Sequence, residues 1–140
     1  MYFPYLRGRQ FELIAIRDLA SEDALEKIVP IIEPVKESFN SLNLANKILF
    51  ETGVKPFLIM NPQVGEACGD IEHYLKYIED LENSMYRHAF IYSDNASYIL
   101  DCLNNYSLNN CMVVGLDSFT NEDEFSLLCE DGRISHIVLL

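Results

Sequence analysis

Four polar residues follow short apolar runs in this chain, and they are the side chains whose chemistry the sequence makes most visible. The runs end at Glu33, Asn61, Asp94 and Asp117. Apolar runs that alternate with helical segments indicate parallel strands joined by crossover helices, and in such folds the carboxyl ends of the strands carry the chemistry. We therefore expect a site at these strand ends. Its three acids are the candidate catalytic residues, and Asn61 is a candidate ligand-binding residue.

Glu33 is the strongest of these candidates. It follows a pair of isoleucines and precedes Pro34, whose missing N–H makes a helix-capping role for Glu33 poor. A carboxylate in that setting either serves a site at the mouth of the sheet or forms a buried salt bridge. The other strand-end residues also have structural interpretations, because Asn61 suits a turn and both aspartates suit the N-caps of following helices.

A basic cluster near the N-terminus, Arg7 and Arg9 with the nearby Glu12, is unusual in an acidic chain. Gly8 permits backbone conformations that hold both guanidinium groups on one side. We expect one of two roles. Either the arginines close over an anionic, phosphate-bearing ligand together with Glu12, or they neutralise Glu12 and Glu33 and pin the N-terminal arm across the sheet.

The sequence gives few indications of metal or cofactor binding. Three histidines, His73, His88 and His136, are scattered without metal-ligand spacing. An oxygen-only site for Mg²⁺ or Mn²⁺ built from the three strand-end acids is the remaining metal hypothesis. We predict no metal and assign no cofactor. No phosphate-cradling or nucleophile-elbow motif is present, so the sequence does not decide whether the protein is an enzyme.

The elements that must position these residues follow from hydrophobic periodicity. Strands are expected at 29–35, 56–61, 89–94, 111–117 and 136–140. Helices are expected at 10–19, 37–52, 71–81 behind an Asp70 cap, 97–106, and from a capping box at Thr120 to Gly132, with a short helical turn at 21–26. The irregular stretch 62–69 follows a strand end and should overhang a site there.

This order predicts an α/β fold of five parallel strands, partial and TIM-barrel-like, with a flavodoxin-like three-layer sandwich as the alternative. Residues 1–140 are expected to form a single α/β domain. A complete β/α barrel needs eight strands and about 250 residues. We therefore expect this chain to be the N-terminal half of a longer barrel protein.

The N-terminal motif is consistent with that expectation. Residues 2–13, Tyr-Phe-Pro-Tyr-Leu-Arg-Gly-Arg-Gln-Phe-Glu-Leu, and residues 31–35, Ile-Ile-Glu-Pro-Val, resemble the opening of the "Beta protein" family of bacterial and phage proteins. The resemblance covers the first 35 residues. It implies a barrel-like protein of about twice this length, of phage or mobile-element type, whose biochemical activity is unassigned.

Charge and hydropathy restrict the partners. With a formal net charge of −12, the chain lacks the basic surface that nucleic-acid binders need. No secretory signal or membrane-length apolar stretch appears, so a cytoplasmic protein is expected. The apolar strand at 136–140 should bind a second copy or a missing C-terminal half.

Two functions follow. We favour a non-catalytic protein with a ligand site at the carboxyl ends of the strands. The alternative is an enzyme that acts on an anionic, phosphate-bearing small molecule with the acidic residues at the barrel mouth.

Overall fold

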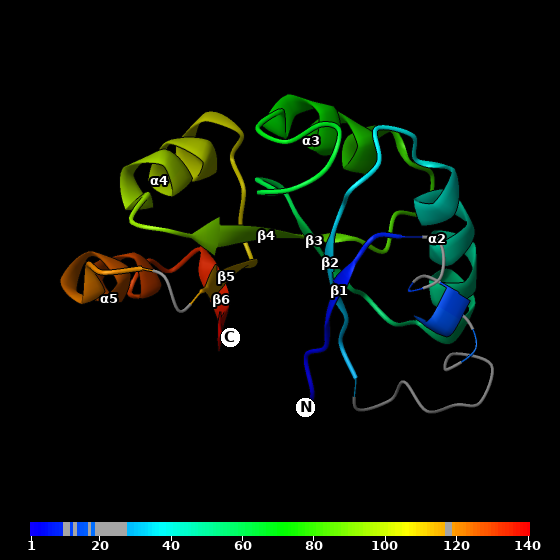
Figure 1. Cartoon of the computed structure of the whole chain (residues 1–140), viewed down its shortest axis with the longest axis horizontal. Coiled ribbons are helices and arrows are strands. Elements are labelled where there is room, and N and C mark those ends of the chain that lie inside the picture. The colour runs from blue at the N-terminus through cyan, green and yellow to red at the C-terminus, as the bar shows by residue number, and fades with distance from the viewer. Residues whose placement is uncertain (10–11, 13, 17, 19–27, 117–118) are drawn as a thin grey trace. The chain divides into compact units, whose positions relative to one another are not determined.

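The chain forms two compact units, Met1–Arg87 and His88–Leu140, each with its own strands and helices (Figure 1). The computed structural model describes residues 1–9, 12, 14–16, 18, 28–116 and 119–140. The predicted turn at 21–26 and the candidate acid Asp117 lie outside the described residues. No helix in the described part of the chain is long and apolar enough to cross a membrane.

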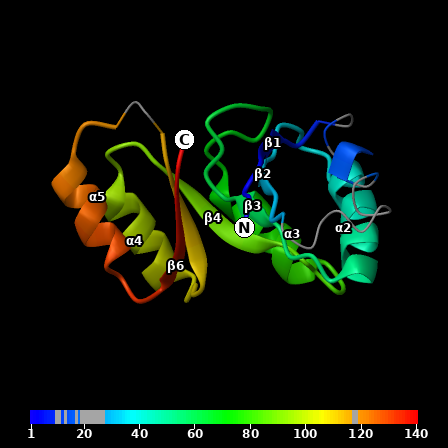
Figure 2. The ribbon, with the colours of Figure 1, turned by 90° about the horizontal axis from the view of Figure 1, so that it is seen from below.

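Unit 1 is built on three short parallel strands in chain order. They are β1 (Tyr5–Arg7), β2 (Ile31–Glu33) and β3 (Phe57–Ile59), and Figure 2 shows them side by side. Every residue of β2 and β3 is buried, as expected for parallel strands that are covered on both faces. The register sets Arg7 opposite Glu33, so the end of β1 lies directly beside the end of β2.

Two long helices of unit 1 begin and end near the predicted positions. Helix α2 (Asn40–Thr52) stops where Gly53 adopts a left-handed φ of 74°. Helix α3 (Ile71–Asp80) starts at the predicted cap, where the Asp70 carboxylate accepts a 3.2 Å bond from the N–H of His73. In the predicted 10–19 helix, the described residues 12, 14–16 and 18 are helical.

Unit 2 repeats the alternation of strand and helix. Its strands are β4 (Arg87–Tyr92, which starts at the last residue of unit 1), β5 (Cys111–Gly115) and β6 (Ile134–Leu139), and they pair in parallel in chain order. The helices α4 (Ala96–Asn105) and α5 (Glu122–Cys129) lie side by side (Figures 1 and 2).

The predicted class, parallel strands alternating with helices, is confirmed. The expected number of five strands is wrong, because the described residues form six. Strand β1 was missed since a three-residue strand that begins after Pro4 is too short to show a period. The flavodoxin-like alternative needs a reversal of strand order next to its first strand. Unit 1 has none, because β2 lies between β1 and β3.

Helix α5 differs from its prediction at both ends. Its N-cap is Asn121, whose side chain exchanges two 3.0 Å bonds with Glu124, so the expected start at Thr120 is one residue early. The helix ends three residues before Gly132. There Asp131 shapes a turn instead, because its carboxylate accepts the Arg133 N–H at 2.9 Å and pairs with the guanidinium at 2.8 Å.

Candidate functional site

The carboxyl ends of β1 and β2 bring together the first group of predicted site residues. Register partners on parallel strands point to the same face, so Tyr5, Arg7 and Glu33 share one face of the sheet of unit 1. The Tyr5 hydroxyl donates a hydrogen bond to the Glu33 carboxylate. Burial, and then the charge of Glu33, raise the pKa of Tyr5 well above its usual range. The phenol therefore stays protonated and remains a donor.

Glu33 is almost completely buried, with 4% of its surface exposed. Its second partner is the backbone N–H of Gln63, which donates to Oε2 at 3.0 Å. The carboxylate thus connects β2, where it resides, to β1 through Tyr5 and to the segment after β3 through Gln63. Asn61, the predicted strand-end amide, is half-buried at the start of that segment.

The expected ion pair between the N-terminal arginines and these acids is wrong. Among the described residues, neither Arg7 nor Arg9 forms a salt bridge with Glu12 or Glu33. Both arginines are exposed. A long guanidinium side chain keeps its hydration and its rotamer freedom in water, while Tyr5 holds Glu33 at a lower entropic cost. Glu12 is half-buried, and its Oε2 atom has no hydrogen-bond partner in the described structure.

The irregular segment 62–69, which we call the 62–69 loop, packs on the chain that follows β2. Glu66 donates its N–H to the Val35 carbonyl at 3.0 Å. Its carboxylate accepts the N–H of Glu37 at 2.8 Å and lies 3.4 Å from Lys36 Nζ. Gly65 has a φ of 102°, and a Cβ there would be 2.6 Å from the Cα of Val35. Only glycine allows so close an approach.

A cavity of about 220 Å³ opens beside the ends of β1 and β2, at the start of α2. It is lined by the turn after β1, the connection between β2 and α2, and the first turn of that helix. The lining residues are Gly8, Pro34, Val35, Lys36, Ser38, Asn40, Ser41 and Leu42. The predicted cluster reaches the cavity through Gly8, which stands between Arg7 and Arg9.

The N-terminus of α2 carries no strong cap of its own. Its N-cap residue, Phe39, makes no side-chain cap bond, and its first turn has no acid. A side-chain bond just before it is long, 3.4 Å from the N–H of Asn40 to Ser38 Oγ, and the Phe39 carbonyl accepts the N–H of Asn43 at 2.8 Å. No hydrogen bond in the described structure satisfies the N–H groups of Ser41 and Leu42. Helices α3 and α5 instead have side-chain caps and acids in their first turns.

Asp94 belongs to unit 2, and its bonds hold the start of α5 in place. Its carboxylate accepts the N–H of Asn121 at 2.8 Å, the N–H of Thr120 at 3.1 Å and the Thr120 hydroxyl at 2.9 Å. These bonds, that of Asn121 first, lower the pKa of Asp94 below 3.8. The predicted role of Asp94 as the N-cap of the following helix is wrong, because Asn95 is the N-cap of α4 and Asp94 bonds to the residues before α5.

Metal ligands do not gather in the described residues, where no group of three His, Cys, Asp or Glu side chains is placed to hold an ion. Of the three acids in the Mg²⁺ or Mn²⁺ hypothesis, Glu33 lies in unit 1 and Asp94 in unit 2. Asp117 lies outside the described residues.

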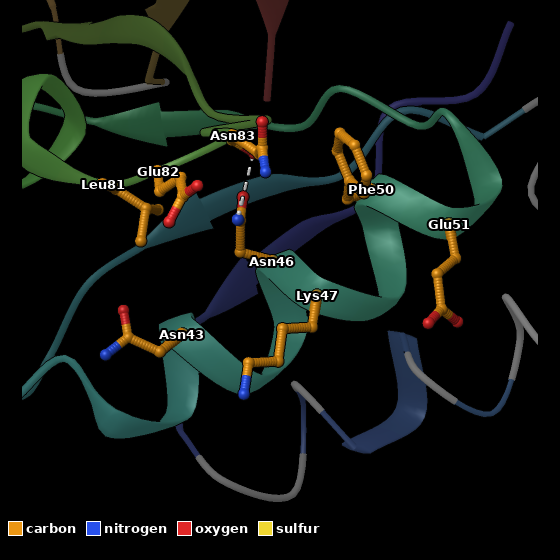
Figure 3. Close-up of a pocket in the computed structure, with 8 residues that line it drawn as sticks. All are labelled: Asn43, Asn46, Lys47, Phe50, Glu51, Leu81, Glu82 and Asn83. Carbon is orange, nitrogen blue, oxygen red and sulfur yellow. Dashed lines mark hydrogen bonds between the residues drawn. The ribbon is translucent and has the colours of Figure 1, made fainter.

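A larger cavity, of about 520 Å³, lies between the second half of α2 and the residues after α3 (Figure 3). Its floor is the buried Asn46, whose amide donates to the Asn83 carbonyl at 3.2 Å and accepts the N–H of Met85 at 2.8 Å. Both ends of this amide are thus used to tie the chain after α3 to α2. We assign Asn46 a structural role.

No protein-family model, curated protein or solved structure matches this chain.

Sequence reasoning missed the residues that surround Glu33 and the cavity, namely Tyr5, Lys36, Ser41, Gln63 and Glu66. Tyr5 had a usable signal, because it lies two residues before Arg7 and so shares its face once β1 is recognised as a strand. Gln63 contributes only its backbone N–H, which any residue other than proline supplies. The residue type at position 63 therefore gave no indication of the bond to Glu33.

Replacing Glu33 by alanine should destabilise the protein by roughly 2 to 3 kcal/mol, because the Tyr5 hydroxyl and the Gln63 N–H lose a charged acceptor in a buried place. Chemical denaturation of the variant and the wild type measures this. Glu51→Ala, at an exposed position on α2, is the control and should stay within about 0.5 kcal/mol. Equal midpoints for Glu33→Ala and wild type would show that Glu33 does not hold these strands together.

Replacing Asp94 by asparagine should make the stability of unit 2 less dependent on acid pH. The pKa of Asp94 is lower in the folded state than its usual 3.8. Ionised Asp94 therefore stabilises the fold above about pH 4, and this contribution is lost as the pH falls through the folded pKa. The variant should be less stable than wild type at neutral pH, and the two should converge in acid.

Denaturation midpoints measured across the acid range check this convergence, with the exposed Asp101→Asn on α4 as the control. A constant difference between Asp94→Asn and wild type at every pH would contradict it.

Proposed function

We propose that unit 1 binds an anionic, phosphate-bearing small molecule in the cavity at the carboxyl ends of β1 and β2, and we assign it no reaction. The observation that carries the proposal is the uncapped start of α2, which opens into a cavity that Lys36 also lines. Free N–H groups at a helix N-terminus attract anions, because the helix dipole adds to their hydrogen bonds.

The position and charge of the site support this function. The carboxyl ends of parallel strands are where α/β folds bind ligands. Arg7 and Arg9 flank Gly8, which lines the cavity, and they form no ion pair within the described structure. In a chain with net charge −12, such a concentration of cationic groups without ion pairs favours a small anion over a nucleic-acid backbone.

The size of the cavity limits what enters it. A whole drug-sized ligand needs about 300 Å³ or more, and this cavity has about 220 Å³. A phosphate group fits this volume, so the cavity takes the anionic end of the ligand while the rest lies outside, near the arginines. Glu33 serves here as a positioning residue, because its bonds to Tyr5 and Gln63 hold the three strand ends in register.

Replacing Ser41 by aspartate tests the site without removing any side-chain hydrogen bond found in the described structure. A carboxylate in the first turn of α2 supplies the anion that this helix lacks, so it should compete with phosphate and weaken binding about tenfold or more. The free energy of unfolding should stay equal or rise slightly, by about 0.3 to 1 kcal/mol. Calorimetric titration with inorganic phosphate and pyrophosphate measures affinity, and the amide shifts of Ser41 and Leu42 locate binding.

Ser97→Asp is the matched control, because Ser97 is the second residue of α4, as Ser41 is of α2, and α4 also lacks a side-chain cap bond and an acid in its first turn. It should leave anion binding unchanged. If neither anion saturates the wild type, or if Ser41→Asp binds as the wild type does, the proposed function is wrong.

A second candidate function, binding of a partner through β6, is favoured by the exposure of that strand. Alternate residues of β6 are exposed, and 49% of Ile137 and 66% of Leu139 is accessible. Apolar side chains on a strand at this exposure form an adhesive surface. A second copy is the partner we propose, because self-association is the commonest assembly.

Wild-type protein should therefore show a mass that rises with concentration in light scattering. The double variant Ile137→Lys, Leu139→Lys should remain monomeric, since two charges at these positions repel a second strand. A wild-type mass equal to one chain at every concentration would exclude this assembly.

A further inference from the structure

An anion from this chain, the carboxylate of Glu66, lies beside the proposed anion site and pairs with Lys36, which lines it. It accepts the N–H of Glu37 at 2.8 Å through Oε2, and Oε1 lies 3.4 Å from Lys36 Nζ. These bonds, the backbone one first, lower the pKa of Glu66, so it is ionised at neutral pH. Lys36, the one cation that lines the cavity, is therefore shared between Glu66 and any ligand.

Glu66 reaches this position because the 62–69 loop is held against the chain after β2. Its N–H bonds to the Val35 carbonyl, and the neighbouring Gly65 lies against the backbone of Val35 at a distance that no side chain permits. The attachment is local. The middle of the loop is held by the Gly65 contact and the bonds of Glu66 to residues 35–37, while its start stays bonded to Glu33 through the Gln63 N–H.

We propose that the 62–69 loop is a latch on the anion site, with Glu66 as an internal competitor that an incoming dianion displaces from Lys36. This inference rests on the proposed function. A phosphate dianion carries twice the charge of a carboxylate, so it gains more from Lys36 and the α2 N-terminus than Glu66 does. A monoanionic carboxylate has no such advantage. The latch therefore selects doubly charged ligands over singly charged ones.

Two variants release the latch by different means. Glu66→Gln removes the competing charge, and Gly65→Ala forces the loop away from Val35 without changing any charge. Both should bind inorganic phosphate about tenfold more tightly than wild type, and both should bind acetate, which the wild type should not. Calorimetric titration measures these affinities. Amide hydrogen exchange in the 62–69 loop should be faster in both variants without ligand.

The controls match each change. Glu79→Gln removes an exposed acid from α3, and Gly53→Ala strains a left-handed glycine of φ 74° that has nothing within 4 Å of its added Cβ. Both should bind phosphate and exclude acetate as the wild type does. If they also gain affinity, the effect comes from net charge or from general backbone strain, and the latch is wrong.

The remaining outcomes separate the latch from the proposed function. If the wild type binds phosphate, Ser41→Asp weakens it, and both latch variants bind as the wild type does, then the site exists and the latch is wrong. If no protein in the set binds phosphate or pyrophosphate, both are wrong. If the latch variants bind phosphate and the wild type does not, phosphate does not displace Glu66 from Lys36, and the latch is wrong together with the proposed function.

Discussion

The buried carboxylate of Glu33 is the constraint on which the rest of unit 1 depends. Three strands of three residues each supply few ladder bonds, so they need another means of holding their ends together. Glu33 provides it from the middle strand, through the Tyr5 hydroxyl on β1 and the N–H of Gln63 after β3. Both donors are neutral. Among the described residues, Arg7 and Arg9 form no salt bridge with Glu33 or Glu12, and both arginines stay exposed. Glu33, one of the candidate catalytic acids of the sequence analysis, thus holds β1 and the segment after β3 against β2.

Much of the fold was predictable from the sequence, because its elements follow from hydrophobic period and local caps. Asp70 and Gly53 ended up at the helix boundaries their chemistry predicts. The misplaced start of α5 has another cause, which is competition between partners distant in sequence. Thr120 is a good N-cap by type, yet its hydroxyl is bonded to Asp94, so Asn121 caps α5 instead. Asp94 lies 26 residues before Thr120, so no sequence pattern within α5 could have predicted this bond.

The site was predictable to a smaller extent for the same physical reason. The strand-end rule placed Glu33 at the end of a strand, where it lies in β2, since the rule depends only on where an apolar run stops. The rule does not say which donor forms a hydrogen bond with the acid. We expected an arginine, because Arg7 and Arg9 are nearby basic residues in the sequence. In the structure, a hydroxyl two residues from Arg7 on the same strand face does so. Pairing choices depend on side-chain entropy and hydration as well as charge, and these terms are visible only once the backbone is placed.

Among the described helices, α2 and α4 start without a side-chain cap bond or an acid in the first turn, and the start of α2 also lines the cavity beside Lys36. Acids outnumber basic residues by 22 to 10, and α5 has three acids in its first turn. With so many acids present, a first turn without one, beside a lysine and a cavity, is the place where an outside anion gains most. Glu66 reaches the edge of this place from a position 26 residues beyond the start of α2, held by contacts that a single side-chain atom at Gly65 would break. An anion supplied from a detachable loop allows exchange, whereas an anion within the helix would fill the site permanently.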